Sequence, residues 1–395
     1  MSPRIRIILK SGKEQSLRRY HPWIFSGAIK EIKGSLVEGD MVDVYSNNEE
    51  FLGTGHYAGG SIAVRILSFE PVNDIRDLFI KRITAAIDYR KRIGLVDNHE
   101  TNAFRLINAE GDGLPGLVVD YYNGLVVTQC HSVGMLKEID MIKEGLKIVF
   151  GRKLTSVIDR SESTIPARFL PGADAHEQLP EIEKKEITEN GNRFYVDLNE
   201  GQKTGFYIDQ RENRKLLGSC SEGRSVLNLF GYTGGFSIYA IRGGARLVHT
   251  VDSSSIAIDL ARENVKLNFG DIKLHQAFSE DVSEFLQKAK ETYDLVISDP
   301  PAFAKHQRAL ENALQGYKRL NTRIFEVISP GGIVFTFSCS QVVSRENFRK
   351  SIFAAAANAG RQIKIMHQLS QPPDHPVSIY HPEGEYLKGL VLYVE

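Results

Sequence analysis

Strand and helix signals alternate along the second half of the chain, from about residue 199 onward. Short apolar runs are followed in turn by stretches with helical spacing, and the predicted strands of this series are residues 225–230, 247–252, 273–276, 294–298 and 333–338. Repeated strand–helix units force a parallel sheet with right-handed crossovers. The last two apolar runs, 363–366 and 387–394, have no helix between them, so one terminal strand should be antiparallel. The pattern predicts an α/β fold with a mostly parallel, Rossmann-like sheet.

Two segments with different patterns precede this α/β domain. Residues 1–72 contain five short strand signals separated by Gly, Asp, Asn and Ser turns, which predicts a small β-barrel. Residues 73–185 combine helical spacing with a hairpin around Asn123-Gly124, the strongest short hairpin signal. This central segment is therefore expected to be an α+β domain. The 395 residues are divided into domains at 1–72, 73–185 and 186–395, and the last begins with a second hairpin.

The composition excludes several classes of protein. Hydrophobic residues make up 42% and charged residues 25% of the chain, which is ordinary for a globular enzyme and excludes a disordered chain. No run of about 18 apolar residues is present, so we expect no membrane span. The N-terminus lacks the pattern of a signal peptide, and we expect a cytoplasmic protein. Cys130, Cys220 and Cys339 form no CxxC or Cys/His cluster, so we expect free thiols and no metal site.

The charge is balanced overall but uneven along the chain. Lys plus Arg and Asp plus Glu both number 49, whereas a general polyanion binder is usually basic. Residues 1–33 nevertheless hold eight cations against two acids. This segment is either a solvated basic face or a patch that contacts phosphates.

A glycine-rich turn follows the first strand of the α/β domain, at Gly231-Tyr232-Thr233-Gly234-Gly235. Ligands of such sheets bind beyond the carboxyl ends of the strands, at the first βα turn. A dinucleotide-binding loop has the form G-x-G-x-x-G, and here Thr233 replaces the second glycine. The turn is therefore less suited to wrapping phosphates, which favours S-adenosylmethionine over NAD as the cofactor.

Two carboxylates follow the next two strands. Asp252 ends the second strand, 21 residues after Gly231, where a carboxylate can accept hydrogen bonds from both ribose hydroxyls. Asp281 could accept from an adenine amino group, or it could add negative charge to the start of a helix at 279–289 capped by Ser279. The cofactor contacts predicted for this edge of the sheet are Phe230, Gly231, Thr233, Gly234, Asp252, Ser253, Asp281 and Asp299.

An acid and a thiol follow the fourth and fifth strands. Asp299 precedes Pro300 and Pro301, which stiffen the turn and fix the direction of the carboxylate. Cys339 follows the fifth strand and could be an inert core residue. Because neighbouring parallel strands end at the same edge, we expect Cys339 and Asp299 to face one pocket. The flanking serines suit a solvated, reactive thiol better than a dry core.

A thiol and an acid beside a methyl donor point to methylation at C5 of a pyrimidine. C5 is too electron-poor to attack a sulfonium methyl group until a thiolate adds at C6. A carboxylate accepts from the N4 amine of cytosine and is repelled by O4 of uracil, so cytosine is the expected base. Transfer to an exocyclic amine, with Asp299 at its centre, would need no thiol. A noncatalytic RNA-binding factor and, more remotely, a nicotinamide oxidoreductase are further alternatives.

Several stretches of this sequence resemble one known family, the bacterial 23S ribosomal RNA cytosine-5 methyltransferases of the large-subunit methyltransferase I type. The stretches are HPWIFSGA at 21–28, RLI at 105–107, AEGDGLPG at 109–116, GQKTGFYIDQR at 201–211, DPP at 299–301 and SCS at 338–340. The resemblance covers essentially the whole chain. It implies an N-terminal PUA domain that binds RNA, a central α+β domain and a C-terminal class I methyltransferase domain.

The same resemblance implies roles for individual residues. Phe206, Asp209 and Gln210 would help enclose S-adenosylmethionine, and Cys339 would be the nucleophile. The partner would be 23S ribosomal RNA. A homodimer is one option, and the sequence does not give the oligomeric state. Many other RNA cytosine-5 methyltransferases carry a second cysteine after a proline in the fourth-strand motif, and this chain does not. The base that removes the C5 proton is therefore not assigned.

Overall fold

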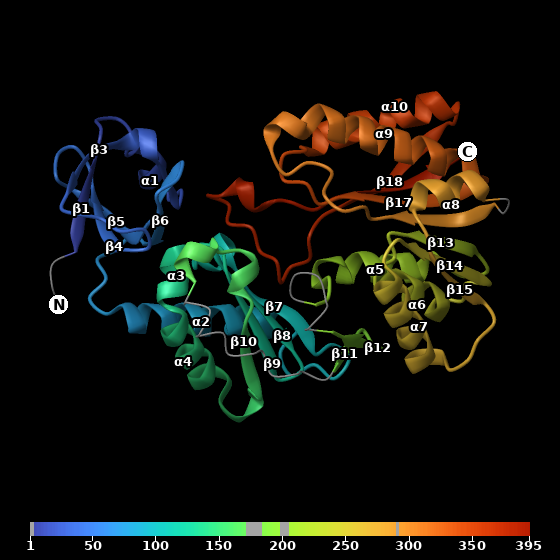
Figure 1. Cartoon of the computed structure of the whole chain (residues 1–395), viewed down its shortest axis with the longest axis horizontal. Helices are drawn as coiled ribbons and strands as arrows, with labels where there is room; N and C mark the ends of the chain where they lie inside the picture. The colour runs from blue at the N-terminus through green and yellow to red at the C-terminus, as the bar shows by residue number, and fades with distance from the viewer. Residues whose placement is uncertain (1–3, 171–183, 198–204, 290–291) are drawn as a thin grey trace. The chain divides into compact units, whose positions relative to one another are not determined.

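The computed structural model describes residues 4–170, 184–197, 205–289 and 292–395, and its chain forms two compact units (Figure 1). The first unit comprises Met1–Lys185, Asp197–Phe206 and Pro373–Gly384. The second comprises Glu186–Val196, Tyr207–Pro372 and Glu385–Glu395. The domain boundaries predicted from the sequence stay a prediction.

A six-stranded sheet in the order β2-β6-β5-β4-β1-β3 forms the N-terminal part of the first unit. A turn at Ser26–Ala28 splits the strand expected at 23–29 into β2 and β3, which lie at opposite edges of this sheet. A link of three residues spans at most about 14 Å, so the sheet must curl to bring its edges together. The result is a half-barrel. Its elements are β1 (Ile5–Leu9), α1 (Gln15–Arg18), β2 (Trp23–Phe25), β3 (Ile29–Lys33), β4 (Met41–Tyr45), β5 (Phe51–Tyr57) and β6 (Ile62–Ser68).

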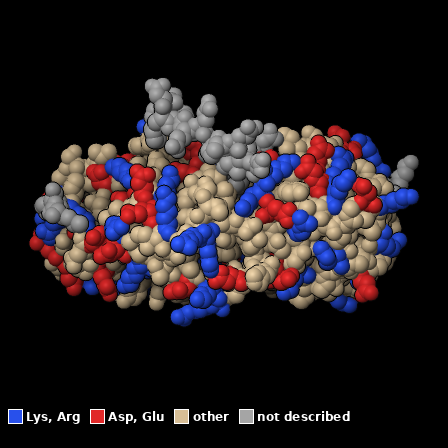
Figure 2. Space-filling model, turned by 90° about the horizontal axis from the view of Figure 1, so that it is seen from below, with Lys and Arg blue, Asp and Glu red and all other residues tan. Residues whose placement is uncertain are grey.

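Acidic side chains of β4 and the following turn pair with the basic N-terminal segment. Arg4 contacts Asp43 at 3.6 Å and Lys33 contacts Glu49 at 3.2 Å. Arg18 contacts Glu50 in the same way. Over residues 1–72, nine Lys and Arg stand against eight Asp and Glu. On the face drawn in Figure 2, basic and acidic side chains are interspersed. These observations favour a solvated face over a phosphate-contacting patch.

The central part of the first unit is a four-stranded sheet in the order β10-β9-β8-β7, packed with helices. Asn123 and Gly124 join β8 to β9 with φ of +47° and +90°, the backbone that an Asn-Gly hairpin turn requires. The apolar face of α4 contributes Ile142 and Leu146 to the core. The elements are α2 (Ile75–Arg92), β7 (Ala103–Asn108), β8 (Leu117–Tyr122), β9 (Leu125–Cys130), α3 (Val133–Lys137), α4 (Ile139–Phe150) and β10 (Ser156–Asp159).

The segment Pro373–Gly384 lies between β18 and β19 in the sequence but belongs to the first unit. The buried Arg90 of α2 donates a hydrogen bond to the carbonyl oxygen of Asp374 at 2.6 Å. The ring of His381 packs edge-on against Trp23, with centroids 4.3 Å apart. This late segment therefore completes the packing of the first unit.

The second unit contains a seven-stranded sheet in the order β15-β14-β13-β16-β17-β19-β18. Its strands are parallel except β19, which is antiparallel to both β17 and β18, as the absence of a final helix predicts. The strands are β13 (Ser225–Leu229), β14 (Leu247–Asp252), β15 (His275–Ser279), β16 (Tyr293–Ser298), β17 (Ile328–Ser338), β18 (Ile363–Leu369) and β19 (Lys388–Val394).

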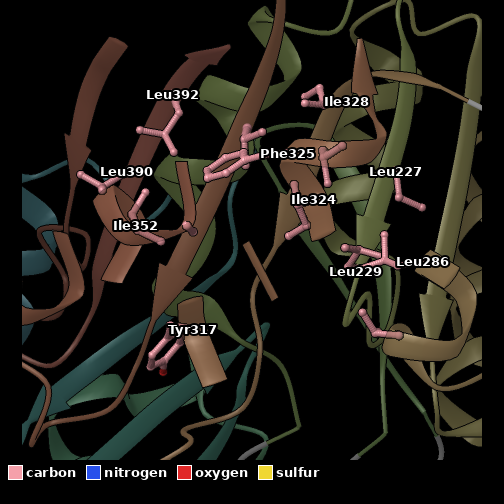
Figure 3. Close-up of a cluster of buried hydrophobic side chains, with 14 of the residues drawn as sticks. Leu227, Leu229, Leu286, Tyr317, Ile324, Phe325, Ile328, Ile352, Leu390 and Leu392 are labelled. Carbon is pink, nitrogen blue, oxygen red and sulfur yellow. The ribbon is translucent and has the colours of Figure 1, made fainter. Parts of the chain in front are cut away.

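Helices cover both faces of this sheet. Alternate residues of one strand point to opposite faces, so Leu227 and Leu229 pack with α8, α9 and α10, whereas Val226 packs with α5 and α6. Figure 3 shows the first of these clusters, where Phe325 of α9 and Leu392 of β19 lie among its members. The helices are α5 (Arg211–Ser219), α6 (Gly235–Arg242), α7 (Ser255–Phe269), α8 (Val282–Lys288), α9 (Leu310–Val327) and α10 (Arg345–Ala359).

The hairpin of β11 (Lys185–Glu189) and β12 (Asn192–Val196) contributes the acidic partner of a buried ion pair in the second unit. Arg214 of α5 donates to both carboxylate oxygens of Glu189, at 2.7 and 2.6 Å. The Arg214 and Glu189 side chains are 3% and 0% exposed, and the Tyr239 hydroxyl also donates to Glu189.

In the part of the chain that the structure describes, no helix is both long and apolar enough to cross a bilayer. The same residues contain no cluster of three metal-ligating side chains.

Replacing Glu189 with Gln should lower the free energy of unfolding by about 3–5 kcal/mol, because the Arg214 charge would stay buried without its counterion. Urea denaturation followed by circular dichroism measures this change. Glu186→Gln is the matched control, since the Glu186–Arg193 pair on the same hairpin is about half-exposed and should cost less than about 1 kcal/mol. Equal losses in the two variants would contradict the importance of the buried pair.

Candidate active site

The turn after β13 has an unusual backbone. Phe230 and Tyr232 have φ of +56° and +45°, a region that costs a residue with a side chain about 1–2 kcal/mol. Gly231 approaches β14 so closely that an added Cβ would collide with the Thr250 side chain. Gly234, with φ of +79°, is the N-cap residue directly before α6. Strain of this kind concentrates at functional turns, where the surrounding structure holds it in place.

Asp252 ties this turn to the carboxyl end of β14. One carboxylate oxygen accepts from the backbone N–H of Tyr232 at 3.0 Å, and the other accepts from Ser254 at 2.9 Å. A carboxylate offers about four acceptor positions, so Asp252 can still accept two further hydroxyl groups. Ser253 is exposed beside it, and the buried Thr233 accepts a hydrogen bond from Asn264 through its carbonyl.

Asp281 caps a helix in the structure. Its carboxylate accepts from the backbone N–H groups of Ser283 and Glu284, at 2.8 and 3.2 Å, so α8 begins at Val282. The expected cap, Ser279, instead ends β15. Asp281 itself is therefore the cap, in place of Ser279, and its charge lies at the start of α8. Its contact with adenine stays a prediction.

Asp299 lies at the end of β16 and is oriented by Gln210. The Gln210 amide donates to Asp299 Oδ2 at 2.9 Å and accepts from Asn213 at 2.6 Å, which fixes the direction of the amide. Gln210 is only 3% exposed. Its neighbour Asp209 accepts from the Tyr386 hydroxyl at 2.7 Å. The other oxygen of Asp209 is buried, with no hydrogen-bond partner among the described residues.

Cys339 follows β17, the parallel neighbour of β16, as predicted. Its Sγ lies 3.9 Å from the carbonyl oxygen of Pro300, the residue after Asp299. The thiol is half-buried, so it is neither sealed in the core nor fully exposed. Ser338 and Ser340 are both buried, and the Ser340 hydroxyl donates to the Ala304 carbonyl. The Ser340 hydroxyl therefore binds the loop at Ala304, and both serines are buried instead of forming the solvated surroundings that we expected.

The structure brings several predicted residues together around Tyr207. Burial raises the pKa of the Tyr207 hydroxyl, and nearby Tyr232, Asp299, Asp209 and Cys339 raise it further. The rings of Tyr207 and Tyr232 meet edge-on, with centroids 5.1 Å apart. Tyr207 thus connects the strained turn with the acid and the thiol. The sequence interpretation missed it, although it lies inside the stretch 201–211.

Lys388 at the start of β19 is a second residue that the sequence interpretation missed. Its Nζ donates to the carbonyl oxygens of Ser340 and Tyr386, both at 2.6 Å. Burial lowers its pKa to about 8, and the nearby Cys339 opposes this shift.

Phe206 belongs to the first unit, where it is buried and its carbonyl accepts from the Tyr122 hydroxyl at 3.4 Å. Its predicted cofactor contact stays a prediction.

Known proteins match this chain over nearly its whole length. Residues 114–388 match the family of S-adenosylmethionine-dependent methyltransferases, and residues 7–69 match the PUA-like domain. The ribosomal RNA large subunit methyltransferase I of Aeromonas salmonicida is 39% identical over 396 residues and covers 98% of both chains. The protein of the same name from Shewanella amazonensis is 39% identical over 401 residues and covers 99% of both.

Two solved structures are similar over the same extent. A SAM-dependent methyltransferase from Streptococcus mutans has a TM-score of 0.82 at 25% identity, covering 98% of this chain and 99% of that one. A methyltransferase in complex with SAH has a TM-score of 0.83 at 26% identity, with the same coverage. The predicted fold class and the predicted cofactor, S-adenosylmethionine, are thereby confirmed. From the level and extent of these similarities, the chain belongs to the ribosomal RNA large subunit methyltransferase I family.

Proposed function

We propose that this protein methylates C5 of a cytosine in the 23S RNA of the large ribosomal subunit. The names of its relatives supply the class of substrate. The single observation that supports the position of methylation is the placement of Cys339 and Asp299 at the ends of adjacent parallel strands, with Sγ 3.9 Å from the Pro300 carbonyl. An acid and a thiol that follow neighbouring strands at the same edge of the sheet can act on one planar ring.

The residues around the first βα turn fit S-adenosylmethionine. Asp252 can still accept hydrogen bonds from the two ribose hydroxyls. Gly231 lies so close to β14 that this position has no room for a side chain. The buried Asp209 oxygen without a described partner can accept from the amino group of the methionine portion. When bound, the cofactor supplies its methyl group as an electrophilic sulfonium and leaves as S-adenosylhomocysteine.

Cys339 supplies the electrons that make C5 nucleophilic. Its thiolate adds to C6, so a C6–S bond forms and the electron pair of the C5–C6 double bond becomes available at C5. After C5 has gained the methyl group, a base removes the C5 proton. The electron pair of that C–H bond restores the double bond, the C6–S bond breaks, and the thiolate of Cys339 is regenerated.

Asp299 orients the base. The Gln210 amide holds its carboxylate in one direction, so an oxygen can accept from the N4 amine of cytosine. Uracil would place a carbonyl oxygen there and be repelled. The target must be unpaired or flipped out of a helix to reach these groups, at a cost of about a few kcal/mol. Structured RNA supplies such bases most readily in loops.

Replacing Cys339 with Ala should abolish methyl transfer and leave SAH affinity unchanged, because the thiol is needed for the attack on C6 and not for the cofactor. RNA containing 5-fluorocytidine should form a denaturation-resistant adduct with the unaltered protein, since fluorine cannot leave C5 as a proton does. The adduct should be lost in Cys339→Ala and kept in the control Cys220→Ala. Methyl transfer by Cys339→Ala would instead favour transfer to an exocyclic amine.

Replacing Asp252 with Ala should weaken SAH binding by at least about tenfold, since hydrogen bonds to a charged group contribute roughly 1.5–3 kcal/mol. Calorimetry measures the affinity, and a thermal melt checks that the turn still folds. Asp271→Ala removes an exposed carboxylate of the same unit and serves as the matched control. Equal affinities in the two variants would contradict the role of Asp252.

Mass-spectrometric mapping of ribosomal RNA from a strain without this protein should show one 23S cytosine that has lost its 5-methyl group. Reintroducing the unaltered gene should restore the methyl group, and the Cys339→Ala gene should not. A methyl group missing from an exocyclic amine would overturn the assignment to C5. No missing methyl group, together with no affinity for SAH, would favour a noncatalytic RNA-binding factor.

A further inference from the structure

A buried lysine, Lys388, lies close to the Cys339 thiol. It belongs to β19, which runs antiparallel to β17, the strand that Cys339 follows. Lys388 is paired in register with Ser338, the residue before Cys339. Its Nζ donates to the carbonyl of Ser340, the residue after Cys339, and to the carbonyl of Tyr386. The lysine is therefore aligned with the residue before Cys339, and its ammonium group binds the backbone of the residue after it.

Burying the charged form of Lys388 costs free energy. Lys388 is only 4% exposed, and an ammonium group removed from water loses much of its hydration energy. Two neutral carbonyls replace that hydration only in part, and burial lowers the pKa of Lys388 to about 8. An apolar side chain of similar length would fill the same space at lower cost. A buried, perturbed charge beside a reactive group is typical of a functional site.

The charges that face this lysine and the thiol come from several elements. Arg345 of α10 lowers the pKa of Lys388, whereas Cys339 and the nearby Glu385 raise it. Asp299 and the hydroxyls of Tyr207 and Tyr317 also lie near the thiol. A carboxylate such as Asp299 opposes a second negative charge at Cys339. A cation fixed next to the thiol counters this repulsion.

We propose that Lys388 is a positioning residue that stabilises the thiolate of Cys339 through its fixed, buried ammonium group. The inference deepens the proposed function, on which its catalytic consequence rests. Below about pH 8 the lysine carries its charge and favours the thiolate. As the pH rises through this range, the lysine loses its proton and the support disappears. The rate of methyl transfer should therefore be highest in the pH range above the ionisation of the Cys339 thiol and below the neutralisation of Lys388.

The test measures the reactivity of Cys339 without requiring RNA or methyl transfer. The full chain with Cys220→Ser is treated with iodoacetamide over a range of pH, and alkylation of the Cys339 peptide is followed by mass spectrometry. Cys130 should stay unmodified, because burial raises the pKa of its thiol to about 12. Lys388→Met should move the alkylation profile up by about one pH unit and slow the reaction at pH 7 by about tenfold. Lys388→Arg, which keeps the charge, should retain most of the reactivity.

The controls separate this proposal from its alternatives. SAH affinity and a cooperative thermal melt check the fold of each variant. If Lys388→Met does not melt cooperatively, Lys388→Gln is a second neutral variant, which keeps N–H donors on a side chain that is one atom shorter. An unchanged alkylation profile in the neutral variant would overturn the role of Lys388. A shifted profile together with methyl transfer by Cys339→Ala would leave the lysine–thiolate pairing intact and overturn the proposed function instead.

Discussion

The parallel pairing of β13, β14, β16 and β17 is the constraint on which the rest of the second unit depends. These strands run in one direction, so Asp252, which ends β14, lies at the same edge of the sheet as Asp299 and Cys339, which follow β16 and β17. Packing on both faces holds that register. A shift by a single residue would exchange the two apolar clusters, since Val226 and Leu227 point to opposite faces. The packing of the two apolar clusters thus determines where Asp252, Asp299 and Cys339 lie at the edge of the sheet.

Side chains at this edge are oriented by other side chains instead of being left to rotate. Gln210 fixes Asp299 and is itself fixed by Asn213, while Tyr386 holds one oxygen of Asp209. Such supporting contacts reduce the reorganisation that a reaction would otherwise require. The strained backbone at Phe230 and Tyr232 belongs to the same pattern, because the Asp252 carboxylate accepts from the N–H of Tyr232 and stabilises the turn.

Local patterns predict the order of strands and helices in the α/β domain well, because buried parallel strands read as apolar runs and their ends as polar residues. The helix start at Asp281 differs from the expected cap at Ser279, since either residue can accept backbone N–H groups and only the observed backbone distinguishes them. Tyr207 and Lys388 escaped prediction for another reason. Their surroundings depend on strands and loops far apart in the sequence, and Lys388 reads locally as the edge of an apolar strand.

The segment Pro373–Gly384 gives the chain an unusual order of assembly. Arg90 and Trp23 belong to the earliest part of the sequence, yet their contacts with Asp374 and His381 cannot form until nearly the whole polypeptide has been synthesised. The N-terminal portion therefore leaves the ribosome before its own packing can be completed. A protein shortened at its C-terminus to before Pro373 would therefore lose these contacts of Trp23 and Arg90, far away in the sequence.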